Sequence, residues 1–161
     1  MRLFIAILLS EEMQKAIVAC MHDLKKQGVE GNYVPAQNLH MTLAFIGEYD
    51  DPGRVKRVIE KVPFAPFRLS VSEKGNFGTT LWAGVKGNQK LKTYVKELRE
   101  ALSAEGIPVE KDKFVPHITL IRKAAAKKPY QVHLPKAEMT AERVSLMKSE
   151  IKNGKPVYRE L

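Results

Sequence analysis

Cysteine is almost absent from this 161-residue chain, in which Cys20 is the only one. A single thiol excludes an internal disulfide framework, and it also excludes a metal site built on several cysteines, such as a zinc finger. With 44% hydrophobic and 28% charged residues, the composition is that of an ordinary globular protein rather than a disordered one. The length predicts one domain over residues 1–161.

Long hydrophobic runs are also missing. The longest, Leu3–Leu9, has seven residues and is followed at once by the polar residues 10–12. It is too short to span a bilayer, and no cleavage-site pattern of a signal peptide lies beside it. Such a run is typical of a buried β-strand. We therefore expect a cytoplasmic protein with no membrane partner.

Acidic residues are outnumbered, since 27 Lys and Arg face 18 Asp and Glu, for a net charge of +9. Residues 122–161 hold ten of the cations and four of the acids, and so carry +6 of that charge. A basic excess favours an anionic partner, first nucleic acid and second an acidic membrane surface. A solvated basic surface that only aids solubility explains the charge equally well.

A strand–helix–strand pattern first appears in residues 3–47. After the first apolar run, Ser10 is placed as a helix N-cap, and an amphipathic stretch continues to the stop at Gly28. A second apolar run, 39–46, follows and ends at Gly47. This half therefore predicts a strand, a helix and another strand.

The same order of elements recurs in residues 80–122. A strand at 80–85 precedes the N-cap Asn88, a helix that Gly106 ends, and an apolar run at 117–121. The period is about 77 residues, and a repeat of this kind predicts two similar lobes. We expect an α+β fold of two pseudo-symmetric lobes around a central cleft, each with an antiparallel sheet and helices on its outer face.

Other signals fill in the remaining chain. Asp51-Pro52 predicts the start of a short helix, and residues 67–71 alternate as a strand. Gly75-Asn76 and Asn153-Gly154 are typical of hairpin turns. Trp82 is expected in the hydrophobic core.

Each half carries a related tetrapeptide at the start of its last strand, His40-Met41-Thr42-Leu43 and His117-Ile118-Thr119-Leu120. On a strand, residues i and i+2 share one face, so each His lies beside its Thr while the apolar residues face the core. If the pseudo-symmetry brings the strands together, two imidazoles and two hydroxyls converge on one cleft.

This set suits phosphoryl transfer without a metal. Neutral imidazole can accept a proton and imidazolium can protonate a leaving oxygen, and both forms exist near neutral pH. Threonine hydroxyls can donate hydrogen bonds to phosphate oxygens. One His-x-Thr alone is a weak signal, but two at matched places in a repeat are specific. A metal site would need further ligands, and His22 and His133 lie at no useful spacing.

The paired tetrapeptides resemble the duplicated signature of the two-histidine (2H) phosphoesterases, and the likeness runs the length of the chain. The RNA 2',3'-cyclic phosphodiesterase branch, also known as LigT, ThpR or 2'-5' RNA ligase, is the most similar. Further resembling stretches are Arg2–Ile7, Ala44–Gly47, Leu81–Val85, Phe114–Pro116 and Ile121–Arg122, with Leu146–Glu150, Gly154 and Tyr158 near the end.

The resemblance implies a bilobal enzyme that opens RNA 2',3'-cyclic phosphate ends to 2'-phosphate ends without metal or cofactor, with 2'-5' ligation as the reverse reaction. It makes His40 the proton donor to the leaving oxygen and His117 the base that activates water. Thr42 and Thr119 would contact the phosphate. The partners expected are RNA ends or nucleotides bearing a cyclic phosphate, and the protein is expected to be a monomer.

Two substrate-binding residues follow from the same resemblance, each five positions after a motif histidine. Arg122 matches a phosphate-contacting arginine, and Phe45 matches an aromatic surface for a nucleobase. Because five is odd, a regular strand would turn Phe45 away from His40 unless a bulge intervenes. The basic run 123–128 either borders the cleft or is a surface loop.

Two other functions stay open at this point. One is a related phosphodiesterase that acts on a small cyclic phosphate or a 2'-5' oligonucleotide. The other is an RNA-binding module that uses the basic cleft without turnover, although binding alone has no need of two facing imidazoles.

Overall fold

The computed structural model describes residues 1–161 and contains nine strands, three α-helices and one short 3-10 helix. In chain order these are β1 (Arg2–Leu8), α1 (Glu11–Lys26), β2 (Glu30–Tyr33), η1 (Ala36–Asn38), β3 (His40–Glu48), α2 (Pro52–Lys61), β4 (Phe67–Phe77), β5 (Thr80–Lys86), α3 (Gln89–Ala104), β6 (His117–Ala125), β7 (Glu138–Ala141), β8 (Ser145–Lys152) and β9 (Lys155–Glu160).

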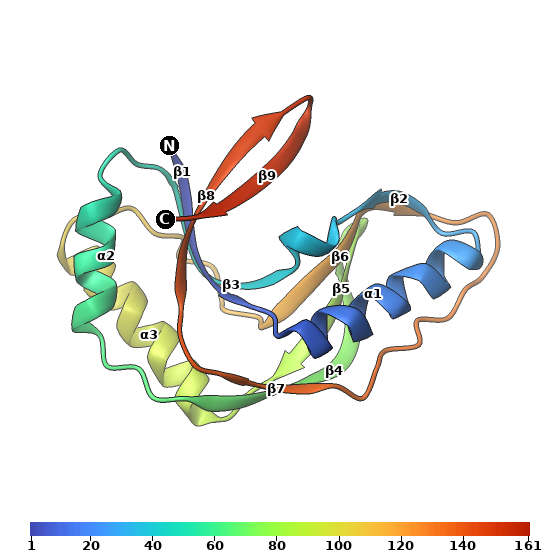
Figure 1. The fold of residues 1–161 in the computed structure, drawn as a ribbon, viewed down its shortest axis with the longest axis horizontal. Helices are drawn as coiled ribbons and strands as arrows, with labels where there is room; N and C mark the ends of the chain where they lie inside the picture. Colours follow the sequence, from blue (N-terminus) through green and yellow to red (C-terminus); the bar gives the residue numbers. More distant parts are fainter.

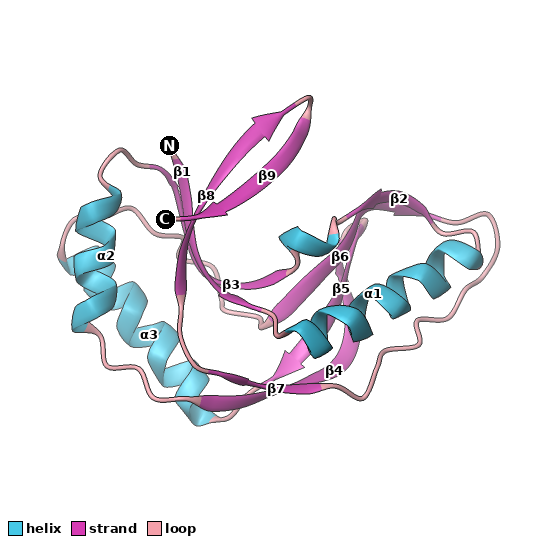
Figure 2. Ribbon diagram, viewed as in Figure 1, coloured by secondary structure: helices cyan, strands magenta, loops and turns pink.

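The strands form two antiparallel sheets (Figures 1 and 2). The four-stranded sheet has the order β3-β1-β8-β9, and the five-stranded sheet has the order β2-β6-β5-β4-β7. One cluster of 35 buried apolar residues draws on both sheets and all three helices. The predicted α+β class with two antiparallel sheets is confirmed. No helix has the length and apolarity that crossing a bilayer requires.

The helices of the two repeats are exchanged between the sheets. Helix α1 follows β1 of the four-stranded sheet, yet it lies beside β2 of the five-stranded sheet, where the Lys25 ammonium sits 5.5 Å from the centre of the Tyr33 ring (Figure 1). Helix α3 follows β5 of the five-stranded sheet but packs against β3 of the other sheet. Each of the two lobes therefore combines the sheet that carries one tetrapeptide with the helix of the other repeat, so that the two halves of the sequence interlock.

The predicted helix ends are confirmed. The Ser10 hydroxyl accepts a hydrogen bond from the backbone N–H of Met13 at 3.2 Å, and the Asn88 side chain caps α3 in the same manner. Gly28 and Gly106 follow the two helices with φ of +87° and +73°, in the left-handed region that glycine adopts without steric cost.

The expected turn at Gly75-Asn76 is wrong. Both residues lie inside β4, and the turn to β5 is made by Gly78 and Thr79. Gly75 is paired with Trp82 across the two strands, and a Cβ at residue 75 would lie 2.2 Å from a carbon of the Trp82 ring. Glycine here serves the close approach of a side chain rather than a turn. The turn at Asn153-Gly154, between β8 and β9, is confirmed.

A β-bulge interrupts β3 three residues after His40. Thr42 is paired with Ala6 and Ala44 with Ile5, so that Leu43 is an extra residue opposite β1. Alternation breaks there, because Leu43 and Ala44 are both buried.

Strand β6 carries the same bulge at the equivalent position. Thr119 is paired with Trp82 and Ile121 with Leu81, which leaves Leu120 as the extra residue. Each tetrapeptide thus ends on a bulge, which shifts the residues that directly follow it by one face; a second irregularity occurs further along each strand, after Phe45 in β3 and after Arg122 in β6.

The backbone carbonyls of the two bulged residues have donors of different kinds, a side chain of α3 for Leu43 and the backbone of the residue that follows β2 for Leu120. The Leu43 carbonyl accepts from Nε and a terminal nitrogen of Arg99 on α3, at 3.1 and 3.0 Å. Arg99 also forms an ion pair with Glu110 at 3.2 Å, and Glu110 in turn bonds the backbone of Phe45. The Leu120 carbonyl accepts from the backbone N–H of Val34 at 2.9 Å.

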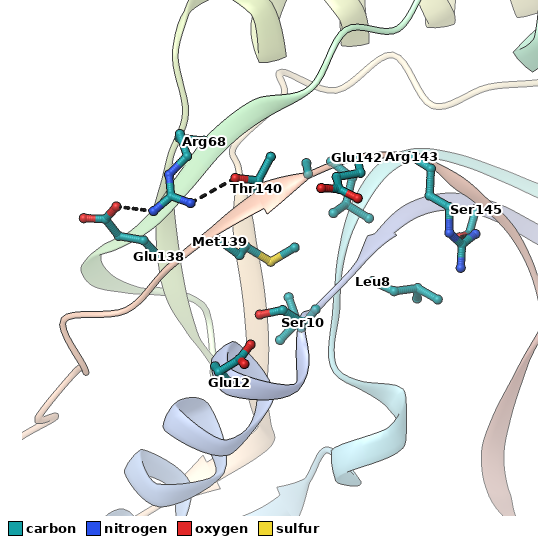
Figure 3. A pocket seen from close by; sticks show the side chains of 13 residues that line it. Leu8, Ser10, Glu12, Arg68, Glu138, Met139, Thr140, Glu142, Arg143 and Ser145 are labelled. Atoms are coloured by element: carbon teal, nitrogen blue, oxygen red, sulfur yellow. Dashed lines mark hydrogen bonds and ion pairs between the residues drawn. The ribbon is translucent and has the colours of Figure 1, made fainter.

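Arg99→Ala is expected to destabilise the protein by about 1–3 kcal/mol, because it leaves the Leu43 carbonyl and the Glu110 carboxylate without their partner in a half-buried site. The measurement is urea unfolding. The matched control is Arg68→Ala, which breaks the Arg68–Glu138 pair at the surface (Figure 3). Both side chains of that pair are more than half exposed, so its loss should cost about 0–1 kcal/mol. Equal losses for the two variants would contradict the assigned role of Arg99.

Candidate active site

A cleft of about 440 Å³ lies where β3 and β6 approach each other from the two sheets. His40 and Thr42 line it from β3, and His117 and Thr119 line it from β6. The structure therefore brings the four motif residues together, as the repeat predicted. All four side chains are half-buried, with the apolar residues between them turned into the core.

The His40 ring is held at both nitrogens. Nδ1 lies 2.7 Å from the carbonyl oxygen of Asn38, and Nε2 lies 2.8 Å from Oγ1 of Thr42. A carbonyl can only accept, so Nδ1 carries a proton and Nε2 is the nitrogen available for acid–base work. Asn38 is itself buried and fixed, because its amide donates to the Pro156 carbonyl at 3.1 Å.

The His117 ring is held in the same way on the other side of the cleft. Its Nδ1 donates to the Val115 carbonyl at 2.6 Å, again the carbonyl two residues before the histidine. Its Nε2 makes no hydrogen bond to a protein group, in contrast to that of His40. Both histidines thus present Nε2 to the cleft in the same tautomer, and only that of His117 is free.

Burial lowers the pKa of His40 from its ordinary value. The bond to the Asn38 carbonyl acts in the opposite direction, while the charge of Arg122, and that of His117 when it is protonated, add to the lowering. The free protein therefore favours neutral His40. An anion bound in the cleft would offset those cations and raise the pKa again.

Aromatic side chains flank both imidazoles. Phe4 and Tyr158 lie with ring centres 5.0 and 5.4 Å from that of His40. Trp82 and Phe77 lie 5.4 and 5.2 Å from His117. The expectation that Trp82 is a core residue is wrong, because its half-buried ring packs between Gly75 and His117 at the edge of the site.

Phe45 and Arg122 both line the cleft. Each is two residues beyond the extra residue of its bulge, which turns it onto the face of the preceding histidine. A bulge does intervene between His40 and Phe45, and it places Phe45 on the same face of β3 as His40. The Arg2 guanidinium lies 4.9 Å from the centre of the Phe45 ring, and Arg122 is exposed at the cleft.

Several residues of the cleft were not found from the sequence. These are Phe77, Arg99, Glu110, Asp112, Lys113, Phe114 and Val115. No local pattern marks them, since Arg99 and Glu110 belong to α3 and the segment after it, and both contact β3 of the opposite sheet. Phe114 and Val115 belong to a stretch that resembles the 2H phosphoesterases, but that resemblance gave them no role in the site.

The other two histidines lie outside this site. His22 and His133 are exposed on the surface and do not line the cleft. A second hollow, of about 520 Å³, lies where β1 leads into α1 and β7 leads toward β8 (Figure 3). It holds no histidine, and Arg68 and Arg143 there form ion pairs with Glu138 and Glu160. No group of three or more His, Cys, Asp or Glu side chains is placed to hold a metal ion.

Residues 11–153 match the model of the 2'-5' RNA ligase superfamily. An RNA 2',3'-cyclic phosphodiesterase of Thermotoga maritima is 30% identical over all of this chain and 93% of its own length, and one of Methanocaldococcus jannaschii is 27% identical over 98% and 96%. The crystal structure of Escherichia coli LigT complexed with 3'-AMP superposes with a TM-score of 0.86 and 26% identity, covering 99% of this chain and 94% of LigT. TT0787 of Thermus thermophilus superposes with a TM-score of 0.78 and 29% identity, covering 100% and 95%. The duplicated His-x-Thr strands, the paired sheets and the extent of these matches show that the chain belongs to the 2'-5' RNA ligase superfamily.

Proposed function

We propose that the protein opens RNA 2',3'-cyclic phosphate ends to 2'-phosphate ends by acid–base catalysis with two histidines and without a metal. The observation that carries this proposal is that two imidazoles from different sheets present Nε2 to one cleft. The name shared by the relatives, RNA 2',3'-cyclic phosphodiesterase, supports the same reaction.

In the proposed reaction, His117 acts as the base. Its Nε2 has no protein partner and takes a proton from the attacking water. The new P–O bond forms as the bond from phosphorus to O3' breaks. His40, in its protonated form, gives the proton on Nε2 to O3', so the product is a 2'-phosphate with a free 3'-hydroxyl.

Three further side chains act on the phosphate. The hydroxyls of Thr42 and Thr119 donate to its oxygens and stabilise the charge that develops there. Arg122 offers a planar guanidinium that can bind two phosphate oxygens at once. Its positive charge also helps to lower the pKa of His40 in the free protein. A bound phosphate would therefore offset the charge of Arg122 and reduce its effect on the pKa of His40.

Phe45 receives the nucleobase next to the cyclic phosphate. Its ring is half-buried at the cleft and is stacked on one side by the Arg2 guanidinium. A flat aromatic surface of this kind accepts bases with little regard to sequence. The same groups would join a cyclic phosphate end to a 5'-hydroxyl as a 2'-5' linkage when that hydroxyl replaces water as the nucleophile, because O3' is again the leaving group. The monomeric state and the cytoplasmic location stay predictions.

His40→Ala and His117→Ala are each expected to lower kcat/KM on a 2',3'-cyclic mononucleotide by about 10²–10⁴-fold, since each removes one proton-transfer step. His22→Ala is the matched control, because His22 is exposed and outside the cleft. Excess chelator should leave the wild-type rate unchanged. A rate that survives in either cleft variant, or that is lost on chelation alone, contradicts the mechanism, and absence of turnover in the wild type favours a binding module.

The pH dependence of the rate should be bell-shaped, and its alkaline limb should differ between two kinetic constants. His40 must be protonated, so the rate falls as the pH rises through its pKa. Burial and Arg122 lower that pKa in the free protein, which kcat/KM reports. Bound phosphate raises it in the complex, which kcat reports. We therefore expect the alkaline limb of kcat to lie at higher pH than that of kcat/KM.

The pH profiles should be measured on a cyclic mononucleotide under conditions in which chemistry limits the rate. In Arg122→Gln, the alkaline limb of kcat/KM should move to higher pH, because one lowering charge is gone. A flat profile, or limbs at the same pH for both constants and both proteins, would show that His40 is not the acid.

A further inference from the structure

A basic groove of about 960 Å³ opens beside the cleft, between the end of β5, the outer face of α3 and the segment before β6. Five cations line it against two carboxylates, Glu73 and Glu100. The cations are Lys86, Lys92, Lys96, Arg99 and Lys113. The groove is thus a concave surface with positive charge on several elements rather than a single charged helix face.

Four of these five cations have no partner in the protein. Lys86, Lys92, Lys96 and Lys113 are exposed and form no ion pair, whereas Arg99 is engaged with β3 and Glu110. Positive charges gathered in one groove repel one another, and without partners in the protein they are available to bind an anion.

The groove is continuous with the catalytic cleft. Arg99, Lys113, Phe114 and Val115 line both. Phe114 is a half-buried aromatic ring at this junction, with the Arg99 guanidinium 5.6 Å from its centre. The Val115 carbonyl, also at the junction, holds Nδ1 of His117. A ligand that extends from the reacting phosphate into the groove would therefore pass directly beside the base.

We propose that this groove binds the phosphate backbone of the single-stranded RNA that precedes the cyclic phosphate end. The inference rests on the proposed function and adds to it a preference for polymer ends over mononucleotides. Repeated lysines along a groove with an aromatic side chain at its head are the features by which proteins bind single strands without reading sequence.

The charge of the C-terminal quarter does not mark this path. Of the ten cations in residues 122–161, only Arg122 lines the cleft, and none lines the groove. Lys127 and Lys128 lie in the exposed stretch after β6. They provide a matched pair of exposed lysines outside the groove.

The test compares two substrates and two variants. The substrates are a 2',3'-cyclic mononucleotide and a single-stranded oligoribonucleotide of roughly eight nucleotides with the same cyclic end. The groove variant is Lys92→Gln/Lys96→Gln, and the control variant is Lys127→Gln/Lys128→Gln. Neither pair belongs to the catalytic machinery, so the mononucleotide rate should stay at the wild-type value in both.

For the groove variant we expect KM on the oligonucleotide to rise about tenfold at moderate salt while kcat changes little. The slope of log kcat/KM against log salt should become shallower by about 1.4, since each contact to a phosphate of a single strand contributes about 0.7. The control variant should keep both the KM and the slope of the wild type.

Three outcomes would overturn the inference. One is an unchanged KM on the oligonucleotide in the groove variant. Another is an equal loss in the control variant, which would direct the strand along the C-terminal lysines instead. The last is a wild type with no preference for the oligonucleotide at low salt. Each leaves mononucleotide turnover intact, whereas failure of the proposed function itself would remove turnover of both substrates.

Discussion

The β-bulge in each histidine strand is the constraint on which the site depends. A regular strand would place His40 and Thr42 on the cleft face but turn Phe45 to the opposite one. The extra residue Leu43 reverses that alternation, and Leu120 does the same for Arg122. A bulge disrupts the pairing with the strand opposite it, so the carbonyl of its extra residue needs a donor other than that strand. The exchanged helix α3 supplies Arg99 to the first, and β2 ends beside the donor of the second, Val34.

The bulges also explain how two strands that share the His-x-Thr-Leu tetrapeptide produce different surfaces. At equivalent positions one lobe has the aromatic ring of Phe45 and the other has the cation Arg122. The two strands share the bulge and the backbone carbonyl, two residues before the histidine, that accepts from Nδ1. The side chains around the two imidazoles differ, and so do the environments of the imidazoles. His40 has its Nε2 bonded to Thr42 and a lowered pKa, while Nε2 of His117 is free. A symmetric scaffold thus carries an asymmetric pair, as a reaction with one acid and one base requires.

Local sequence patterns were sufficient for the elements and for the paired tetrapeptides. Ser10 and Asn88 cap helices because their side chains bond the backbone two or three residues on, a purely local interaction. The turn predicted at Gly75-Asn76 was wrong because a glycine can make room for a side chain on the next strand as well as form a turn. Only the pairing of Gly75 with Trp82 distinguishes the two cases. The contact of Arg99 with Leu43 spans 56 residues and depends on the exchange of helices. The hydrophobic periodicity of the sequence does not indicate which sheet each helix packs against, so this contact could not be predicted.

Helix α3 connects the geometry of the site to the path proposed for RNA. Its buried side carries Leu91, Leu98 and Leu102 into the core. At the margin of that side, Arg99 holds the bulge of β3, while Lys96 and Lys92, one and two turns earlier, face the groove. The groove is thereby fixed relative to the β3 side of the cleft by the same helix that stabilises the bulge.

The segment after α3 makes the second connection, because Lys113 faces the groove and Val115 orients His117. An RNA strand bound along α3 would therefore enter the cleft at a defined position with respect to both histidines. The affinity for the RNA strand would depend on Lys92 and Lys96 of α3, which line the groove. The reaction at the end of the strand would depend on Arg99, which holds the bulge of β3.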